Sequence, residues 1–205
     1  MKALFLVPRG AEAAALERAG ARFVALPAGA HAAAALPADL RGERVIVTGL
    51  CGALGLLAPQ TIVVYDAVVD EQRRYVCDAG PAELLPGAQH VLGTTAARVV
   101  TTTQAKRELG LRTGAQVVDM EGSALAAALA ARDIGFAMIR VVSDDARYDL
   151  PPLANAIDAG GTLRPERVAL AFARKPFAAV RFVRESLRAL RTLEQLARTI
   201  IAAPD

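Results

Sequence analysis

The sequence predicts a single-domain α/β protein with a central mixed β-sheet flanked by helices, followed by a C-terminal amphipathic helix. At both ends of the expected core, short apolar runs typical of buried strands alternate with alanine-rich segments of high helix propensity. Between them the chain is rich in β-formers, which favours a mixed sheet over a simple doubly wound one. With 205 residues, 54% of them hydrophobic, the chain can bury one sizeable core. We therefore expect an α/β core over residues 1–147 and a C-terminal region, residues 148–205, that packs on it.

The front of the chain shows the expected alternation. Residues 2–8 form an apolar run typical of a buried strand, and residues 11–20 form an alanine-rich helix that ends at a glycine. Residues 22–26 are a second short strand. Residues 28–41 combine Ala, Gly and Pro and fit neither pattern clearly. Residues 43–50 are the next strand, and it runs into a glycine-rich turn.

The middle and the back complete the sheet. Residues 61–69 are almost pure β-formers, and residues 73–78 are expected to pair with them as a hairpin. Further short apolar or β-branched runs predict strands at 90–94, 98–103, 115–120 and 136–143. Stretches of good helix formers predict helices at 105–111 and 123–133.

The C-terminal region has a different composition. Pro151-Pro152 and Gly160-Gly161 interrupt it, and apolar residues then recur every three or four positions from Phe177 to Ile200, with most arginines off that stripe. From Arg164 onward the chain has nine Lys and Arg against four Asp and Glu, so its excess positive charge lies here. Two interpretations stay open. The helix packs on the core or on a second subunit with a solvated arginine face, or it meets an anionic membrane surface.

Composition argues against several classes of protein. The mean hydropathy of +0.32 is high, but alanine supplies much of it, and the longest apolar stretches are far short of the roughly 20 residues of a spanning helix. No signal peptide pattern is visible, so we expect a cytoplasmic protein with reduced thiols at Cys51 and Cys77. Neither these cysteines nor His31 and His90 have metal-ligand spacing. Aromatic residues are 4% and Trp is absent, which argues against nucleic-acid stacking.

Two apolar runs end in acids. Residues 117–124 read VVDMEGSA and residues 138–146 read MIRVVSDDA, so Glu121 and Asp144 lie near the ends of two predicted strands. If these strands are parallel neighbours, both acids reach the rim of the sheet where ligands bind. When two carboxyl groups share one crevice, one can stay ionised while the other holds or donates a proton. The simpler interpretation makes Glu121 a first-turn helix acid and Ser143-Asp144 a turn cap. Asp145 should point to the opposite face from Asp144.

These motifs carry a family resemblance. VDMEGSALA and IRVVSDDA, together with MKALFLVPRGAEAAAL at the N-terminus and VIVTGLCGALG at residues 45–55, resemble the purine nucleoside phosphorylase and nucleosidase superfamily. The tail with DLPPLANAIDAGGTLRP resembles the hopanoid-associated branch of that superfamily. The resemblance implies an enzyme that cleaves the N-glycosidic bond of a purine nucleoside. It implies no metal or organic cofactor, although inorganic phosphate is a candidate co-substrate.

The resemblance also implies roles for the acids. Asp144 would assist departure of the purine as a general acid, and Ser143 would orient it. Glu121 would accept hydrogen bonds from the ribose hydroxyls, and Met120 would pack against the sugar. Glu12 would activate water, unless it is simply a solvated acid in the first turn of a helix.

The glycine turn is the remaining part of the expected site. Its backbone N–H groups can approach an anion or a sugar, so we expect substrate binding by Thr48, Gly49, Cys51 and Gly52, and also by Arg140 from the strand that leads to Asp144. Val47 stands where many phosphorylases of the superfamily have an arginine, which counts against the usual phosphate site. Arg9 could supply a substitute cation, so water and phosphate both stay open as nucleophile.

The expected substrate is adenosyl-hopane or another adenosine with a bulky apolar 5′ substituent. The alternatives are a nucleosidase of the methylthioadenosine/S-adenosylhomocysteine type, and a non-catalytic nucleoside-binding protein on the same fold. The expected partners are a small nucleoside, either free or lipid-linked, a peripheral membrane contact at the inner face of the membrane and a second copy of the chain, with a dimer favoured. No nucleic-acid partner is expected.

Overall fold

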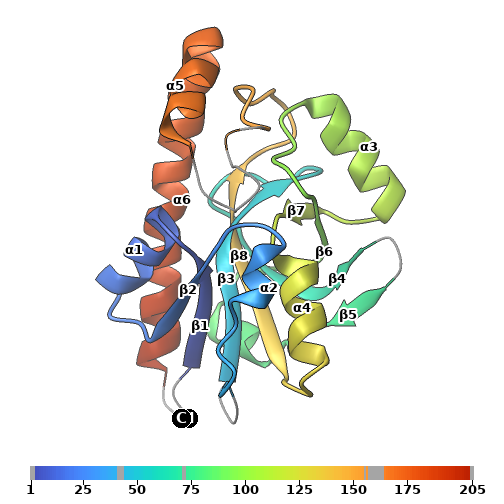
Figure 1. Ribbon diagram of the computed structural model, residues 1–205, viewed down its shortest axis with the longest axis vertical. Helices are drawn as coiled ribbons and strands as arrows, with labels where there is room; N and C mark the ends of the chain where they lie inside the picture. Colours follow the sequence, from blue (N-terminus) through green and yellow to red (C-terminus); the bar gives the residue numbers. More distant parts are fainter. Residues whose placement is uncertain (1–2, 41–43, 71–72, 155, 157–163, 204–205) are drawn as a thin grey trace.

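The computed structural model describes residues 3–40, 44–70, 73–154, 156 and 164–203 (Figure 1). Within these ranges the chain forms eight strands, six α-helices and one 3₁₀ helix. The strands are β1 Ala3–Pro8, β2 Phe23–Leu26, β3 Arg44–Ala53, β4 Ile62–Val69, β5 Arg74–Val76, β6 Gln89–Thr95, β7 Val117–Asp119 and β8 Phe136–Asp144. The helices are α1 Ala11–Arg18, α2 His31–Ala34, α3 Thr103–Thr113, α4 Gly122–Ala130, α5 Pro165–Arg174 and α6 Pro176–Ala202, and the 3₁₀ helix is Gly80–Leu84.

The strands form one mixed sheet, part of which closes on itself. Its order is β2-β1-β3-β7-β6-β4-β5, and β8 pairs with both β3 and β4. The strands β3, β8, β4, β6 and β7 therefore make a closed circuit, with β1 and β2 extending it from β3 and β5 extending it from β4. The long strand β3 is the hub, because it pairs with β1, β8 and β7 in turn.

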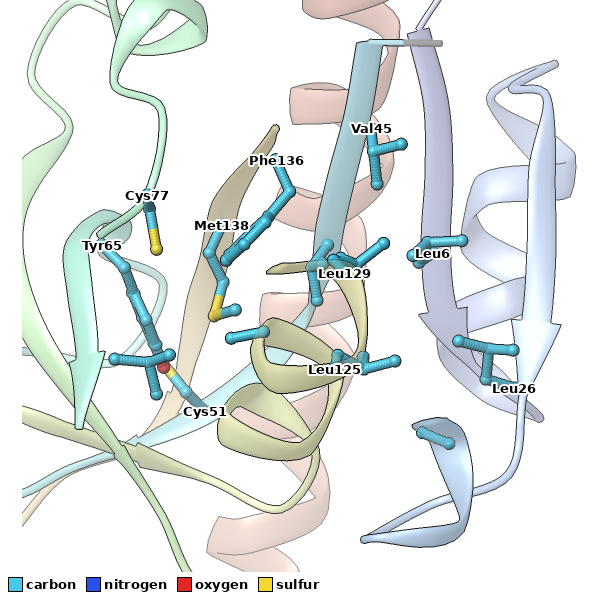
Figure 2. Close-up of a cluster of buried hydrophobic side chains, with 14 of the residues drawn as sticks. Leu6, Leu26, Val45, Cys51, Tyr65, Cys77, Leu125, Leu129, Phe136 and Met138 are labelled. Atoms are coloured by element: carbon cyan, nitrogen blue, oxygen red, sulfur yellow. The ribbon is translucent and has the colours of Figure 1, made fainter. Parts of the chain in front are cut away.

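Helices cover the sheet on two sides. Figure 2 shows Leu125 and Leu129 of α4 among the apolar side chains of one face, close to Met138 of β8. On the other face, α1 and the second half of α6 bury Leu16 and Leu193 in a separate apolar cluster. The predicted fold class, a mixed sheet flanked by helices with a C-terminal amphipathic helix, is confirmed.

One sequence-based expectation is wrong, and one condition stated for the acids is not met. Residues 98–102 are not a strand, because the Thr102 hydroxyl caps α3 by accepting from the Ala105 N–H at 3.1 Å, and threonine at a helix start competes with strand formation. The strands that lead to the two acids are also not parallel neighbours. Both pair with β3, but β7 does so antiparallel and β8 parallel, so β7 and β8 run in opposite directions.

The helix α6 has two different halves. In its second half, Leu193, Leu196 and Ile200 are buried in the cluster shared with α1 and β8. In its first half, Phe177 is 91% exposed and Val180 is 70% exposed. The second half of the apolar stripe therefore packs on the sheet and on α1. None of the helices in the described part of the chain combines the length and apolar character needed to cross a bilayer.

Candidate active site

A cavity of about 720 Å³ opens where β1, β3, β7 and β8 end. Its lining has a polar part and an apolar part. The polar part includes Glu12, Lys106, Glu121, Ser143 and Asp144, from four separate places in the sequence. The apolar part comes from the segments before α3 and after β8 and from α5 and α6. Its residues are Val99, Val100, Leu150, Leu153, Ala156, Val168, Phe172, Phe182 and Leu190.

Glu12 is held against strand β3. It lies in the first turn of α1, and its Oε1 accepts from the Leu50 N–H at 2.7 Å. Gly49 permits this approach, because a Cβ there would lie 2.6 Å from that oxygen and the backbone has φ of 141°. Burial, followed by the charge of Glu121, raises the pKa of Glu12 to about 7, although the Leu50 hydrogen bond and Arg140 oppose the shift. A carboxyl group poised near neutral pH is suited to general base work.

Glu121 occupies the N-cap position of α4, but its side chain does not cap the helix. Instead Oε1 accepts from the Gly29 N–H at 2.9 Å, and Oε2 lies 3.6 Å from Nη1 of Arg140. Burial raises the pKa of Glu121, and Arg140 works in the opposite direction. The arrangement differs from a plain first-turn acid, because the side chain reaches into the cavity and is held there from two sides.

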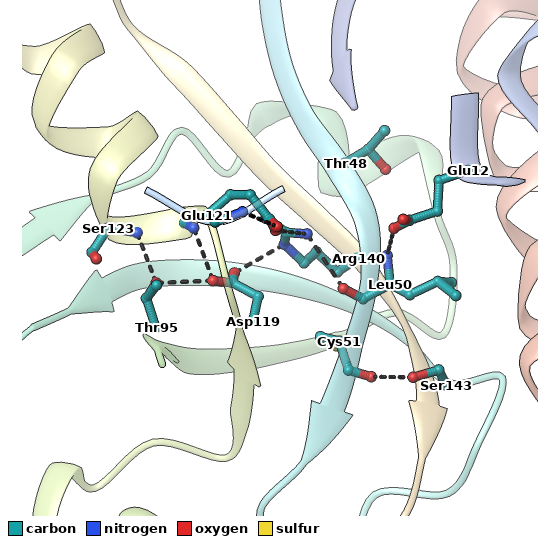
Figure 3. A network of polar contacts seen from close by, with 12 residues as sticks. Glu12, Thr48, Leu50, Cys51, Thr95, Asp119, Glu121, Ser123, Arg140 and Ser143 are labelled. Carbon is teal, nitrogen blue, oxygen red and sulfur yellow. Dashed lines mark hydrogen bonds and ion pairs between the residues drawn. The ribbon is translucent and has the colours of Figure 1, made fainter. Parts of the chain in front are cut away.

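Arg140 and Asp119 form a buried platform behind Glu121 (Figure 3). The Nε of Arg140 lies 3.0 Å from Oδ2 of Asp119, and its Nη1 donates to the Leu50 carbonyl at 3.3 Å. The other oxygen of Asp119 accepts from the Gly122 N–H and from the Thr95 hydroxyl, both at 2.8 Å. Arg140, expected to bind substrate, thus lies behind the cavity wall and positions Glu121 and strand β3.

Ser143 and Asp144 both reach the cavity because of an irregularity in β8. The pairing of β3 with β8 moves from Cys51–Val142 to Gly52–Asp144, so Ser143 is an extra residue on β8. Such a bulge redirects side chains that would otherwise alternate. The Ser143 Oγ lies 2.7 Å from Oδ1 of Asp144 and 3.1 Å from the Cys51 carbonyl. Asp144 packs against Gly52, where a Cβ would lie 3.1 Å from its Oδ2.

The other predicted positions divide into two groups. Met120, Cys51 and Gly52 line the cavity. Thr48 does not line it, since its hydroxyl donates to the Ile139 carbonyl at 2.8 Å between strands. Asp145 points away from the cavity, as predicted, and its Oδ2 accepts from Nε of Arg147 at 2.8 Å.

Lys106 contacts Asp144 but was not predicted from the sequence. Its Nζ comes from α3, forms an ion pair with Oδ2 of Asp144 and donates to the Asp145 carbonyl at 2.6 Å. Its side chain is buried. Asp119 and Thr95 were missed as well. A signal for Asp119 was present, because a buried arginine in the middle of a strand requires an acidic partner.

His31, His90 and Cys77 do not line the cavity, whereas Cys51 does. His31 is exposed in α2, and Nδ1 of His90 lies 2.7 Å from Oδ1 of Asp66. Both cysteines are free thiols, and burial raises the pKa of Cys77 to about 12. Among residues whose placement is described, no three His, Cys, Asp or Glu side chains cluster in a way that could hold a metal ion.

Comparison with known proteins gives a family match and a shared fold. A family model described as the phosphorylase superfamily matches residues 81–152. No curated protein matches the chain by sequence.

Several solved structures share the whole fold. The 5′-methylthioadenosine/S-adenosylhomocysteine nucleosidase of S. pneumoniae with a transition-state inhibitor is 18% identical, with a TM-score of 0.71 over 100% of both chains. The futalosine hydrolase of Helicobacter pylori is 12% identical, with a TM-score of 0.70 over 98% of this chain and 97% of the other. The 5′-methylthioadenosine nucleosidase of Arabidopsis thaliana is 15% identical, with a TM-score of 0.69 over 100% of this chain and 97% of the other. At these identities the likeness establishes the fold.

Proposed function

From the resemblance to the phosphorylase superfamily, which the family match and the shared fold confirm, we propose that this protein is an enzyme that cleaves the N-glycosidic bond of a purine nucleoside. One observation carries the proposal. Glu12, Glu121 and Asp144, from three distant segments, line a single cavity and stand in three different electrostatic surroundings. Carboxyl groups held apart in this way can take separate roles as base, hydroxyl acceptor and partner of the leaving group.

The geometry suits bond cleavage through an oxocarbenium-like transition state. Glu121, held by Gly29 and Arg140, accepts hydrogen bonds from the ribose hydroxyls and thereby fixes the position of the sugar. Asp144 faces the purine. The purine leaves with the electron pair of the broken bond, and a proton added to its ring neutralises the resulting negative charge. Glu12 takes the proton of the attacking water.

Water is favoured over phosphate as the nucleophile. The charge of Glu121 raises the cost of ionising Glu12, which supports a local negative potential that repels a phosphate dianion. Arg9 lines the cavity, but its Nε donates to the Ala25 carbonyl at 3.3 Å and its position is exposed. Water needs a general base to remove its proton when it attacks, and Glu12, with a pKa of about 7, is suited to that role.

The apolar part of the cavity supports a nucleoside with a bulky apolar 5′ substituent. Leu153 and Ala156 form a small apolar cluster with Val99, Phe172 and Phe182 beside the polar site. A chain of CH₂ groups buried there contributes about 0.8 kcal/mol for each group. Adenosyl-hopane, the substrate of the hopanoid-associated branch, is the substrate proposed. A nucleosidase acting on the smaller methylthioadenosine is the alternative.

Product analysis tests the reaction. The purified protein is incubated with 5′-alkylthioadenosines of increasing chain length, with and without inorganic phosphate, and adenine and sugar products are separated. We expect free adenine and a free sugar at rates independent of phosphate, with kcat/KM rising with chain length. A sugar 1-phosphate formed only with phosphate would replace hydrolysis by phosphorolysis. Binding without release of adenine would favour a non-catalytic nucleoside-binding protein.

Glu121→Gln tests the sugar contact. The substitution removes the charge that accepts the ribose hydroxyls, so we expect it to weaken binding of a non-cleavable adenosine analogue far more than binding of free adenine. The loss should be about tenfold or more, since a hydrogen bond to a charged group contributes about 1.5–3 kcal/mol. Calorimetric Kd values for both ligands provide the measurement. A 2′-deoxy analogue serves as the control, because it should narrow the difference between variant and parent. Equal losses for adenine and nucleoside would place Glu121 outside the sugar site.

The exposed half of α6 supports a peripheral membrane contact. Phe177, Val180 and Leu187 are exposed there, and Arg184 and Arg188 are exposed on the same half of the helix. Exposed apolar side chains beside cations suit an anionic bilayer surface, where each charge contributes about 1 kcal/mol. The same half of α6 also lines the cavity through Phe182, so a lipid-linked nucleoside could reach the site from that surface. A second copy of the chain is the other candidate partner.

Reversing Arg184, Arg188 and Arg191 to glutamate tests the surface. We expect the parent to sediment with phosphatidylserine vesicles at low salt and the triple variant to remain in the supernatant, with cleavage of a short soluble adenosine analogue unchanged. Reversing the exposed Arg74, Arg107 and Arg112 is the matched control for net charge. Absence of vesicle binding by the parent, together with a dimer in light scattering, would assign the surface to a second copy.

A further inference from the structure

The cavity contains a buried cation that the reaction as described above does not use. Lys106 lines the cavity with a side chain 1% exposed, and its ammonium lies between Oδ2 of Asp144 and the Asp145 carbonyl. Placing an ammonium in such a position is costly unless it is paired. Its contact with the acid that faces the leaving group suggests that this cost serves the reaction.

The choice of lysine is unusual for this chain. Only three of its 24 Lys and Arg residues are lysines, namely Lys2, Lys106 and Lys175. Arginine stays protonated in proteins, whereas a buried lysine can release its proton. Arginine would also make the better ion pair with a carboxylate, because it binds both oxygens at once. An ion pair needed for stability alone would therefore favour arginine in this protein.

The hydrogen bonds around Asp144 show where a proton is held. Its Oδ2 accepts from Lys106, and its Oδ1 lies 2.7 Å from the Ser143 hydroxyl, which also faces the Cys51 carbonyl. Of the two neighbours, the ammonium is the group that donates an N–H proton to Asp144. The Ser143 hydroxyl is far too weak an acid to supply one. Lys106 is the acidic group next to the carboxylate, and an ammonium has three N–H donors, of which two are used by Asp144 and Asp145.

We propose that Lys106 is the source of the proton that the leaving purine takes up, with Asp144 passing it on. The inference rests on the proposed N-glycosidic cleavage and adds to it. As the bond from the ribose carbon to the purine breaks, its electron pair moves to the purine. The purine ring takes a proton from Asp144, which takes one from Lys106, and Lys106 is left as a neutral amine. The proton that Glu12 removes from water leaves through solvent, and solvent protonates Lys106 again after the purine departs.

Two leaving groups separate this role from a structural one. Purine ribosides require a proton on the leaving group, whereas 4-nitrophenyl riboside releases a phenolate that is stable without one. In Lys106→Met we expect kcat for the purine riboside to fall by about 10²-fold or more, the size of a general acid contribution. We expect kcat for the nitrophenyl riboside to remain within about threefold of the parent.

Lys106→Arg keeps the charge but cannot release a proton, so it should lose purine cleavage as Lys106→Met does. In Lys106→Ala, added ethylammonium should restore purine release and guanidinium should not. Lys175→Met is the matched control, because it removes the exposed pair of Lys175 with Asp149 and should change neither reaction.

Each other result overturns the inference. Purine cleavage at the parental rate by Lys106→Arg would show that only the positive charge at this position matters, and not a transferable proton. Equal losses for both ribosides in Lys106→Met, with no rescue of Lys106→Ala by ethylammonium, would make it a packing residue. If the parent releases neither purine nor nitrophenolate, the proposed function itself fails, and this inference fails with it.

Discussion

Replacing Asp144 with asparagine is expected to lower kcat for purine release by about 10²–10⁴-fold while leaving the protein folded. Asparagine keeps the shape of the side chain and one acceptor oxygen, which can face Ser143 or Lys106 but not both, and it cannot carry a proton to the purine. The main effect should therefore fall on kcat, with a smaller change in KM. Steady-state kinetics on an adenosine substrate, together with a thermal melt, provide the measurement.

A matched variant separates loss of chemistry from loss of an ion pair. Asp66→Asn removes a carboxylate from strand β4 that pairs with His90, away from the cavity. It should leave kcat within about twofold of the parent. A rate for Asp144→Asn within a few-fold of the parent would remove Asp144 from the path of the proton.

Replacing Glu12 with glutamine should abolish the base and leave less than about 1% of parental kcat, as general base catalysis contributes about 10²–10⁴-fold. For the parent, the raised pKa of about 7 predicts that kcat/KM falls as the pH drops through this value, because the protonated carboxyl cannot accept a proton from water. A pH–rate profile from pH 5 to 9 measures this. A parental profile flat across this range would contradict the role of Glu12 as the base.

The same substitution should make the protein more stable at high pH. The pKa of Glu12 is raised from 4.5 in the unfolded chain to about 7 in the folded protein, so the folded state binds the proton more tightly. The stability tied to this group is fully present below pH 4.5 and is lost as the pH rises through about 7. Above that pH, glutamine should recover at most about 3 kcal/mol, and less to the extent that water in the open cavity solvates the carboxylate. Its carbonyl can still accept from the Leu50 N–H.

Urea unfolding at pH 5 and pH 8.5 measures the effect. The gain for Glu12→Gln should be larger at pH 8.5 than at pH 5. Glu17→Gln, on the exposed side of the same helix, should show no such difference. A variant less stable than the parent at pH 8.5 would show that the charge of Glu12 supports the fold.

Much of the fold could be predicted because the local patterns are strong. Alternation of apolar strands with alanine-rich helices identified most elements, and the acids at the ends of β7 and β8 identified two cavity residues. The pairing of those strands could not be predicted in the same way. Their antiparallel relation arises because β3 pairs with β7 in one direction and with β8 in the other. Such a relation depends on three strands together, so the sequence of any one strand does not predict it.

The site shows the same division. Glu12, Glu121 and Asp144 come from short motifs, so a linear sequence reveals them. The bulge at Ser143 depends on the count of residues in two paired strands, and alternation alone would send Ser143 and Asp144 to opposite faces. Lys106 lies in a helix with no motif around it, and the topology alone brings it to Asp144. Its rarity among the cations was the one signal in the sequence.

The closed circuit of strands also determines where the molecule can open. Strands inside it have partners on both sides, so their amide hydrogens exchange with solvent only when much of the fold separates. At the ends of the path, β2 pairs only with β1 and β5 only with β4 among the described strands. In deuterium exchange, amides of Val47 and Val141 should therefore persist long after those of Val24 and Tyr75 have exchanged. Because β3 and β8 carry Cys51, Ser143 and Asp144, the end of the sheet that lines the cavity belongs to the slowest-opening part of the protein.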